Sequence, residues 1–146
     1  MGVTLNSGAF RWENLDVLKY KEEGHHFKDI TRQLLYGGRP ELAVQLRYFE
    51  IGPGGYSTLE RHEHVHFVVI LRGRGKGLVE GRLQKLAPLD TVEVPPKSWH
   101  QFRADADETF GFLCLVRSER DKPELPSGEH LSELRRDPEI AAFIRT

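Results

Sequence analysis

Glycine and proline interrupt the middle of the chain at short and fairly even intervals. They gather at residues 37–38, 52–55, 73–77 and 95–96. Glycine adopts backbone angles that other residues avoid, and proline cannot donate a hydrogen bond within a sheet, so each of these places favours a turn. The segments between the turns are therefore expected to be short strands.

These segments carry the alternation of apolar and polar residues that is typical of a strand with one buried face. Strands are expected at residues 29–36, 42–51, 58–71, 78–86, 90–94, 99–103 and 110–116. Strand and turn units that recur about every 8–12 residues predict an all-β fold, a β-sandwich or barrel.

The 146 residues suffice for one ordinary domain, and the chain divides into three zones. Residues 1–28 have weak periodicity and are interpreted as an arm, flexible or crossing to a partner. Residues 29–117 are expected to form the β-barrel domain. Residues 118–146 contain two helix-start signals, Ser127 and Asp137, the second followed by proline, and predict a linker with two short helices.

Composition excludes several classes of function. Lys and Arg total 21 against 22 Asp and Glu, and this balance argues against a nucleic-acid partner. The longest apolar run, residues 67–71, is too short to span a membrane, and the N-terminus has no pattern of a secretory signal. Cys114 is the only cysteine, which favours a reducing cytoplasm.

Ligand-type side chains gather in one segment. On an extended strand, Glu60, His62, His64 and His66 share one face unless a turn intervenes, and His100 follows on another predicted strand. Imidazole and carboxylate bind divalent transition metals, and buried imidazoles without partners are costly. The pattern predicts one bound metal ion, with Mn, Fe, Co, Ni, Cu and Zn all left open. An exposed polar strand face is the alternative.

The segment 54–102 resembles the two motifs of the cupin superfamily, and especially the small single-domain cupin_2 conserved barrel subgroup. In the first motif, the chain matches the family spacing at Gly54, Glu60, His62, His66 and Gly73. Glu60 stands where the family has its first histidine, and His66 where it has glutamate. The resemblance implies the metal ligands Glu60, His62, His66 and His100. A gapped alignment would instead pair His62 with His64, which makes His64 the alternative ligand.

In the second motif the chain keeps Pro96 and His100. Leu89 and Ser98 stand where the family has glycine, and Ala104 where it has asparagine. The ligand is retained, whereas the missing glycines leave the conformation of the turn open.

The resemblance further implies an antiparallel double-stranded β-helix, or jelly-roll barrel, with a short C-terminal helical region. Family members often dimerise through an N-terminal strand, so a homodimer is expected. By the same resemblance, Arg47 faces the barrel interior, where it could bind an anionic substrate, and Cys114 lies near the metal. Phe102 and Phe112 are expected to form an apolar pocket wall. A surface charge at Arg47 and a plain core thiol at Cys114 are the alternatives.

Open positions on a metal held in this way let a small organic molecule bind directly and be polarised. The leading hypothesis is a metal-dependent, dioxygenase-like oxidoreductase, with His64 and Arg47 contacting the outer shell or the substrate. One alternative is a non-catalytic cupin that binds or senses a small ligand. A second is a metal-dependent isomerase or lyase acting on a sugar or an organic acid, with His64 or Glu63 as general base.

Overall fold

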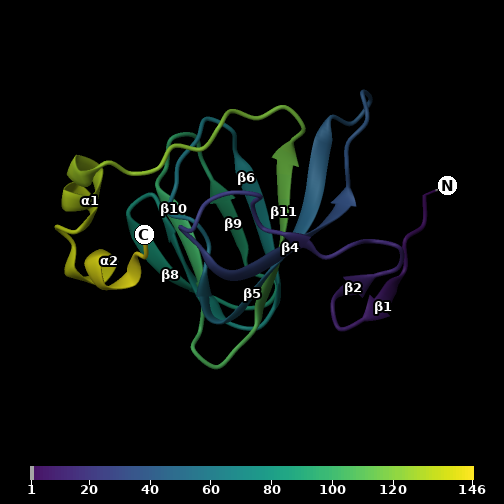
Figure 1. Cartoon of the computed structure of the whole chain (residues 1–146), viewed down its shortest axis with the longest axis horizontal. Coiled ribbons are helices and arrows are strands. Elements are labelled where there is room, and N and C mark those ends of the chain that lie inside the picture. The colour runs from purple at the N-terminus through teal and green to yellow at the C-terminus, as the bar shows by residue number, and fades with distance from the viewer. Residues whose placement is uncertain (1) are drawn as a thin grey trace.

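Strands are the main regular elements of the described chain, and all of their pairings are antiparallel (Figure 1). The structure, a computed structural model, describes residues 2–146. Its strands are β1 (Asn6–Gly8), β2 (Arg11–Trp12), β3 (Leu18–Lys19), β4 (Lys28–Tyr36), β5 (Val44–Tyr56), β6 (His66–Arg72), β7 (Gly75–Val79), β8 (Arg82–Leu86), β9 (Thr91–Val94), β10 (His100–Ala104) and β11 (Phe110–Arg117). Two short helices, α1 (Gly128–Leu134) and α2 (Pro138–Phe143), follow the last strand.

One large sheet joins the strands in the order β8-β7-β10-β5-β11-β6-β9, and β4 pairs with both β5 and β3. The sheet curls into a half-barrel with an apolar inner face. On β6, for example, Val68 and Ile70 are fully buried, whereas Phe67, the residue before Val68, is 43% exposed. This two-residue alternation confirms the prediction of an antiparallel barrel with a short C-terminal helical region.

The strand β5 continues through the segment 52–55, where the sequence predicted a stop. Lys28 pairs with Tyr56 and Ile30 with Ile51, so β5 contains extra residues between these two pairs. A bulge of this kind leaves residues unpaired and bends the strand, which is how a proline is accommodated in a sheet. Beyond the bulge, β5 reaches β10.

The expected strand at residues 58–71 is shorter than predicted, because only β6 is regular. Glu60 and Arg61 make isolated bridges, and the chain bends at Glu63 and His64. The carboxylate of Asp121 accepts hydrogen bonds from the backbone N–H groups of Glu63 and His64, at 2.8 and 3.0 Å. These bonds hold the bend, so the assumption of one extended face does not apply here.

The two helices begin where the sequence predicted. Ser127 caps α1, and Asp137 caps α2 with Pro138 in its first turn. Ile140 and Phe143 of α2 are buried in a second apolar cluster at the end of the barrel. The helices therefore close this end of the molecule.

The N-terminal segment packs against the barrel of its own chain. β1 and β2 form a small hairpin, and β3 pairs with β4. Arg11 forms an ion pair with Glu50 at 3.3 Å, and Phe10 stacks on Tyr48. Crossing of this segment to a partner, and the homodimer itself, stay predictions. In the described part of the chain, no helix has the length and apolar character needed to cross a membrane.

Candidate metal centre

Three histidines from separate places in the fold meet inside the barrel. His62 lies in the loop before β6, His66 begins β6, and His100 begins β10. Their ligand nitrogen atoms all lie within 4.8 Å of one another. Backbone pairing brings them together: Glu60 bridges His100, and the N–H of Lys97 donates to the carbonyl of His62 at 2.8 Å.

Hydrogen bonds orient two of the three rings. Nδ1 of His62 donates to the carbonyl oxygen of His64 at 2.7 Å, and Nδ1 of His100 donates to that of Ser98 at 2.9 Å. A proton on Nδ1 leaves the lone pair on Nε2, and metal-binding histidines typically donate their other ring N–H to a carbonyl or carboxylate in this way.

The other side of the rings lacks partners. Nε2 of His62 and Nε2 of His66 are buried and make no hydrogen bond in the described structure. Buried polar atoms are rarely left so, because each costs free energy. Neutral imidazoles with free Nε2 atoms fit a divalent transition metal ion, so the cluster of His62, His66 and His100 could bind one.

Burial keeps these rings neutral. Loss of solvent, and then the neighbouring His100, lower the pKa of His62 to about 4. Burial also lowers the pKa of His66 and of His100. The neutral form is the one that binds a metal ion, so the environment favours the ligand form.

Glu60, an expected ligand, faces a different partner. Its carboxylate forms an ion pair with the ammonium of Lys21 at 2.7 Å, and its side chain is only 7% exposed. It is not among the residues whose ligand atoms cluster within 4.8 Å, although it lines a cavity with His66 and His100.

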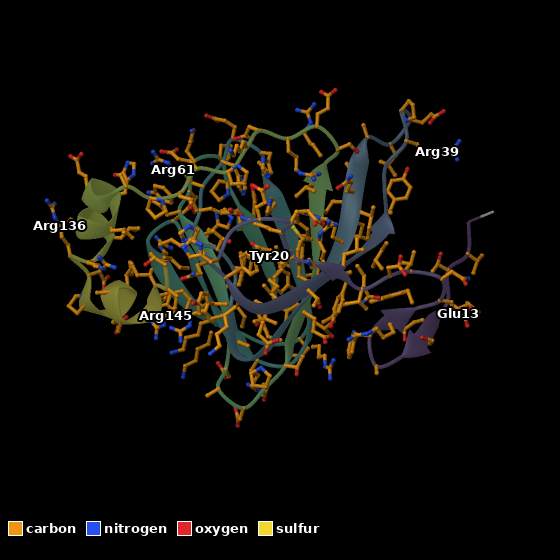
Figure 2. All side chains as sticks on the ribbon, in the orientation of Figure 1. Glu13, Tyr20, Arg39, Arg61, Arg136 and Arg145 are labelled. Carbon is orange, nitrogen blue, oxygen red and sulfur yellow. The ribbon has the colours of Figure 1, made fainter. Side chains whose placement is uncertain are left out.

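Lys21 and its neighbour Tyr20 were missed by sequence reasoning. Both lie just after β3 and line the cavity beside the histidines, and Figure 2 shows Tyr20 over the centre of the barrel. Burial, and then the charge of Glu60, raise the pKa of Tyr20, so its phenol stays protonated. The sequence offered only an apolar residue followed by a polar run, and no spacing links this segment to Glu60.

His64, the alternative ligand, lies at the edge of the cluster. Its ring stacks on that of His62 with 3.6 Å between centroids, and its Nδ1 lies 2.7 Å from Oδ1 of Asp121. A carboxylate that holds a histidine in place is the arrangement of an oriented general base.

Two cavities adjoin the histidines. The larger, about 440 Å³, contains Arg47 together with Lys21, Glu60, His64 and His66 in its wall. The smaller, about 30 Å³, lies among His66, His100 and apolar side chains of the barrel. Its walls include Phe102, Phe112 and Cys114. Burial raises the pKa of the Cys114 thiol.

Two turns, at Leu89 before β9 and at Lys97 before His100, contain no glycine. Leu89 and Lys97 have φ angles of 75° and 60°, in the left-handed region that favours glycine. The residue that takes the second glycine's conformation is therefore Lys97, and the assignment of this position to Ser98 is wrong.

Comparison with known proteins identifies the family of this chain. The sequence model of the cupin domain matches residues 47–116. A cupin 2 conserved barrel domain protein from Rhodopseudomonas palustris is 48% identical, with 99% of each chain covered and a TM-score of 0.93. The chain is a cupin.

Two further relatives of this cupin come from Rhodospirillum rubrum. A crystal structure of a cupin-2 domain is 53% identical over 93% of this chain and 91% of that one, with a TM-score of 0.87. The protein 1-methylthio-D-xylulose 5-phosphate methylsulfurylase is 54% identical over 136 residues, or 92% of this cupin and 86% of the relative.

These findings correct the functional expectation. A dioxygenase-like oxidoreductase is wrong, because the methylsulfurylase is similar over nearly the whole chain and is named for a methylsulfur group on a sugar phosphate. The alternative of isomerase- or lyase-type chemistry on a sugar agrees better with this relative.

Proposed function

We propose that this cupin is a metal-dependent enzyme that removes the methylsulfur group from a 1-methylthio-ketopentose 5-phosphate. The observation that carries the proposal is the 54% identity with the methylsulfurylase over 92% of the chain. The histidine cluster supplies a place where a metal ion could assist this chemistry.

His62, His66 and His100 would hold the metal ion through their Nε2 atoms. A divalent metal supplies Lewis-acid polarisation of a carbonyl oxygen, here that of the ketose at C2. Breaking the bond between C1 and sulfur leaves an electron pair on C1, next to this carbonyl. A thiol that accepts the methylsulfur group as a mixed disulfide, and gives its proton to C1, balances the reaction.

The chain's own residues have separate tasks in this proposal. His64, held by Asp121 at 2.7 Å, lines the larger cavity and is the residue positioned to carry a proton. The smaller cavity, with Phe102, Phe112 and Cys114, offers the apolar surroundings that a methylthio group prefers. Glu60 would stay paired with Lys21 beside the metal ligands.

Turnover of the named sugar phosphate tests this proposal directly. The metal-loaded protein is incubated with 1-methylthio-D-xylulose 5-phosphate and a thiol, and the S-methyl signal is followed by NMR. We expect loss of the thioether signal and appearance of a methyl disulfide, with no dioxygen needed. His66→Ala should abolish turnover, and His25→Ala, at an exposed histidine, should not. An unchanged substrate would overturn the proposal.

A further inference from the structure

Three arginines line the larger cavity without an acidic partner. Arg32 of β4, Arg47 of β5 and Arg120, just after β11, all contribute to its wall of about 440 Å³. None of them forms an ion pair in the described structure. Three guanidinium groups around one cavity give it a positive potential, which attracts an anion.

The hydrogen bonds of these arginines go only to uncharged acceptors. Nε of Arg32 donates to the carbonyl of Lys19 at 3.1 Å. Arg120 donates to the side chain of Gln45 at 3.0 Å and to the carbonyl of Arg117 at 2.9 Å. These bonds aim the guanidinium groups while leaving most of their N–H donors free.

Arg47 is the most constrained of the three. Its guanidinium lies over the ring of Phe49 at 4.9 Å, and one nitrogen donates to Sγ of Cys114 at 3.6 Å. Its Nε is buried and has no partner. An unpaired donor of a permanently charged group is expensive to bury, so Arg47 would gain from an anionic partner in the cavity.

The acidic residues of the same wall are already engaged. Glu60 is paired with Lys21, and Asp121 is held by His64 and two backbone N–H groups. Partial burial, and then the charge of Arg47, lower the pKa of Arg120, with a smaller effect from Arg32. The positive charges of the three arginines are therefore not neutralised by the acidic residues of the cavity wall.

We infer that Arg32, Arg47 and Arg120 bind the phosphate monoester of the substrate in the larger cavity, whose wall also contains His66. The identity of the sugar rests on the proposed function, whereas the anion site rests on these three residues. Guanidinium groups match phosphate oxygens in bidentate geometry, and a cavity of this volume holds a small ligand. The phosphate on C5 lies three carbon atoms from the carbonyl at C2, so one molecule can reach both ends.

Steady-state kinetics on two substrates tests the inference. Metal-loaded wild type, Arg120→Gln and Arg32→Gln are compared on 1-methylthio-D-xylulose 5-phosphate and on the sugar without phosphate. We expect each variant to raise KM for the phosphorylated substrate by about ten- to a hundredfold, the loss typical of one charged contact. Activity on the unphosphorylated sugar should change little, whereas a merely structural effect would lower both. Arg82→Gln, at an exposed residue of β8, is the matched control.

Calorimetric titration with inorganic phosphate separates failure of the inference from failure of the proposed function. If the wild type turns over neither sugar but binds phosphate, and the variants do not, the anion site stands and the proposed substrate falls. Variants that keep both phosphate binding and the preference for the phosphorylated sugar would overturn the inference. So would an effect on the KM of the thiol alone, because the arginines would then serve the acceptor. Metal content and thermal midpoints of all variants check that the site is folded.

Discussion

At the scale of single residues, the site depends on two nitrogen atoms that have nothing to bind. His62 and His66 each direct a buried Nε2 without a partner toward the same point as His100. The carbonyls of His64 and Ser98 fix the tautomers of His62 and His100, so little rearrangement is needed when a metal enters. Preorganisation of this kind favours tight binding.

Removal of one ligand should therefore weaken metal binding strongly. For His66→Ala we expect a loss of more than about 100-fold, since even outer partners of ligands contribute 10- to 100-fold. Equilibrium dialysis followed by elemental analysis measures the bound metal. His25→Ala is the control, because His25 is exposed and lies outside the cluster. Full metal content in His66→Ala would contradict the assignment.

The same histidines should make the metal-free protein sensitive to acid. The pKa of His62 is about 4 in the folded state, below the ordinary value of about 6.5. Between these values the unfolded chain binds a proton that the folded chain does not, so the free energy of unfolding falls as pH drops from 6.5 toward 4. Urea midpoints of the chelator-treated protein at pH 7, 6 and 5 measure this.

His62→Gln is the matched variant for the acid experiment, because it removes one of the groups with a lowered pKa. Its urea midpoint should vary less with pH than that of the wild type, although His66 and His100 still contribute. Equal midpoints at pH 7 and pH 5 in the wild type would contradict the prediction.

At the scale of elements, the segment after β3 completes the wall of the site. Lys21 reaches Glu60, which lies in the loop between β5 and β6. The carboxylate is nearly buried, so it needs this ammonium, and the pair joins the N-terminal segment to the loop that carries His62.

Lys21→Met should destabilise the fold and loosen this wall. We expect a loss of about 1–3 kcal/mol in the free energy of unfolding, because Glu60 is left without its partner in a buried place. Lys19→Met is the matched control, since Lys19 is exposed on β3 and forms no ion pair in the described structure. Glu60→Gln combined with Lys21→Met should recover part of the loss. Equal stability of Lys21→Met and Lys19→Met would contradict the prediction.

Local sequence signals predicted the elements better than their connections. The alternation along β6 and the caps at Ser127 and Asp137 are local, and the structure has them. The continuation of β5 through its bulge depends on pairing with both β4 and β10, which no local pattern encodes.

For the candidate site too, the sequence predicted some residues but not the contacts between remote segments. The resemblance to the cupin motifs pointed to Glu60, His62, His66 and His100, and the fold brings the three histidines together. The bend at His64 depends on Asp121, and the place of Glu60 depends on Lys21. Both partners are remote in sequence, so the choice between Glu60 and His64 could not be made from spacing.

At the scale of the whole molecule, one barrel brings together chemistry that the sequence separates. The three arginines of the larger cavity come from β4, β5 and the segment after β11, and its histidines come from the loop before β6 and from β6 itself. Substitution of the side chains that face the cavity alters its lining while the backbone pairing of the sheet can stay the same, which suits a fold that serves many reactions.

The pairing of β5 with β11 also brings together residues of the two cavities that are remote in the sequence. Arg47 and Cys114 touch across this pair although 67 residues separate them. Closing so long a loop costs entropy before any contact repays it, so such pairings form late and slowly. During synthesis, the N-terminal segment and most of the histidines leave the ribosome well before β11 does. The metal is thus expected to bind after β11 has been synthesised, when the chain is nearly complete.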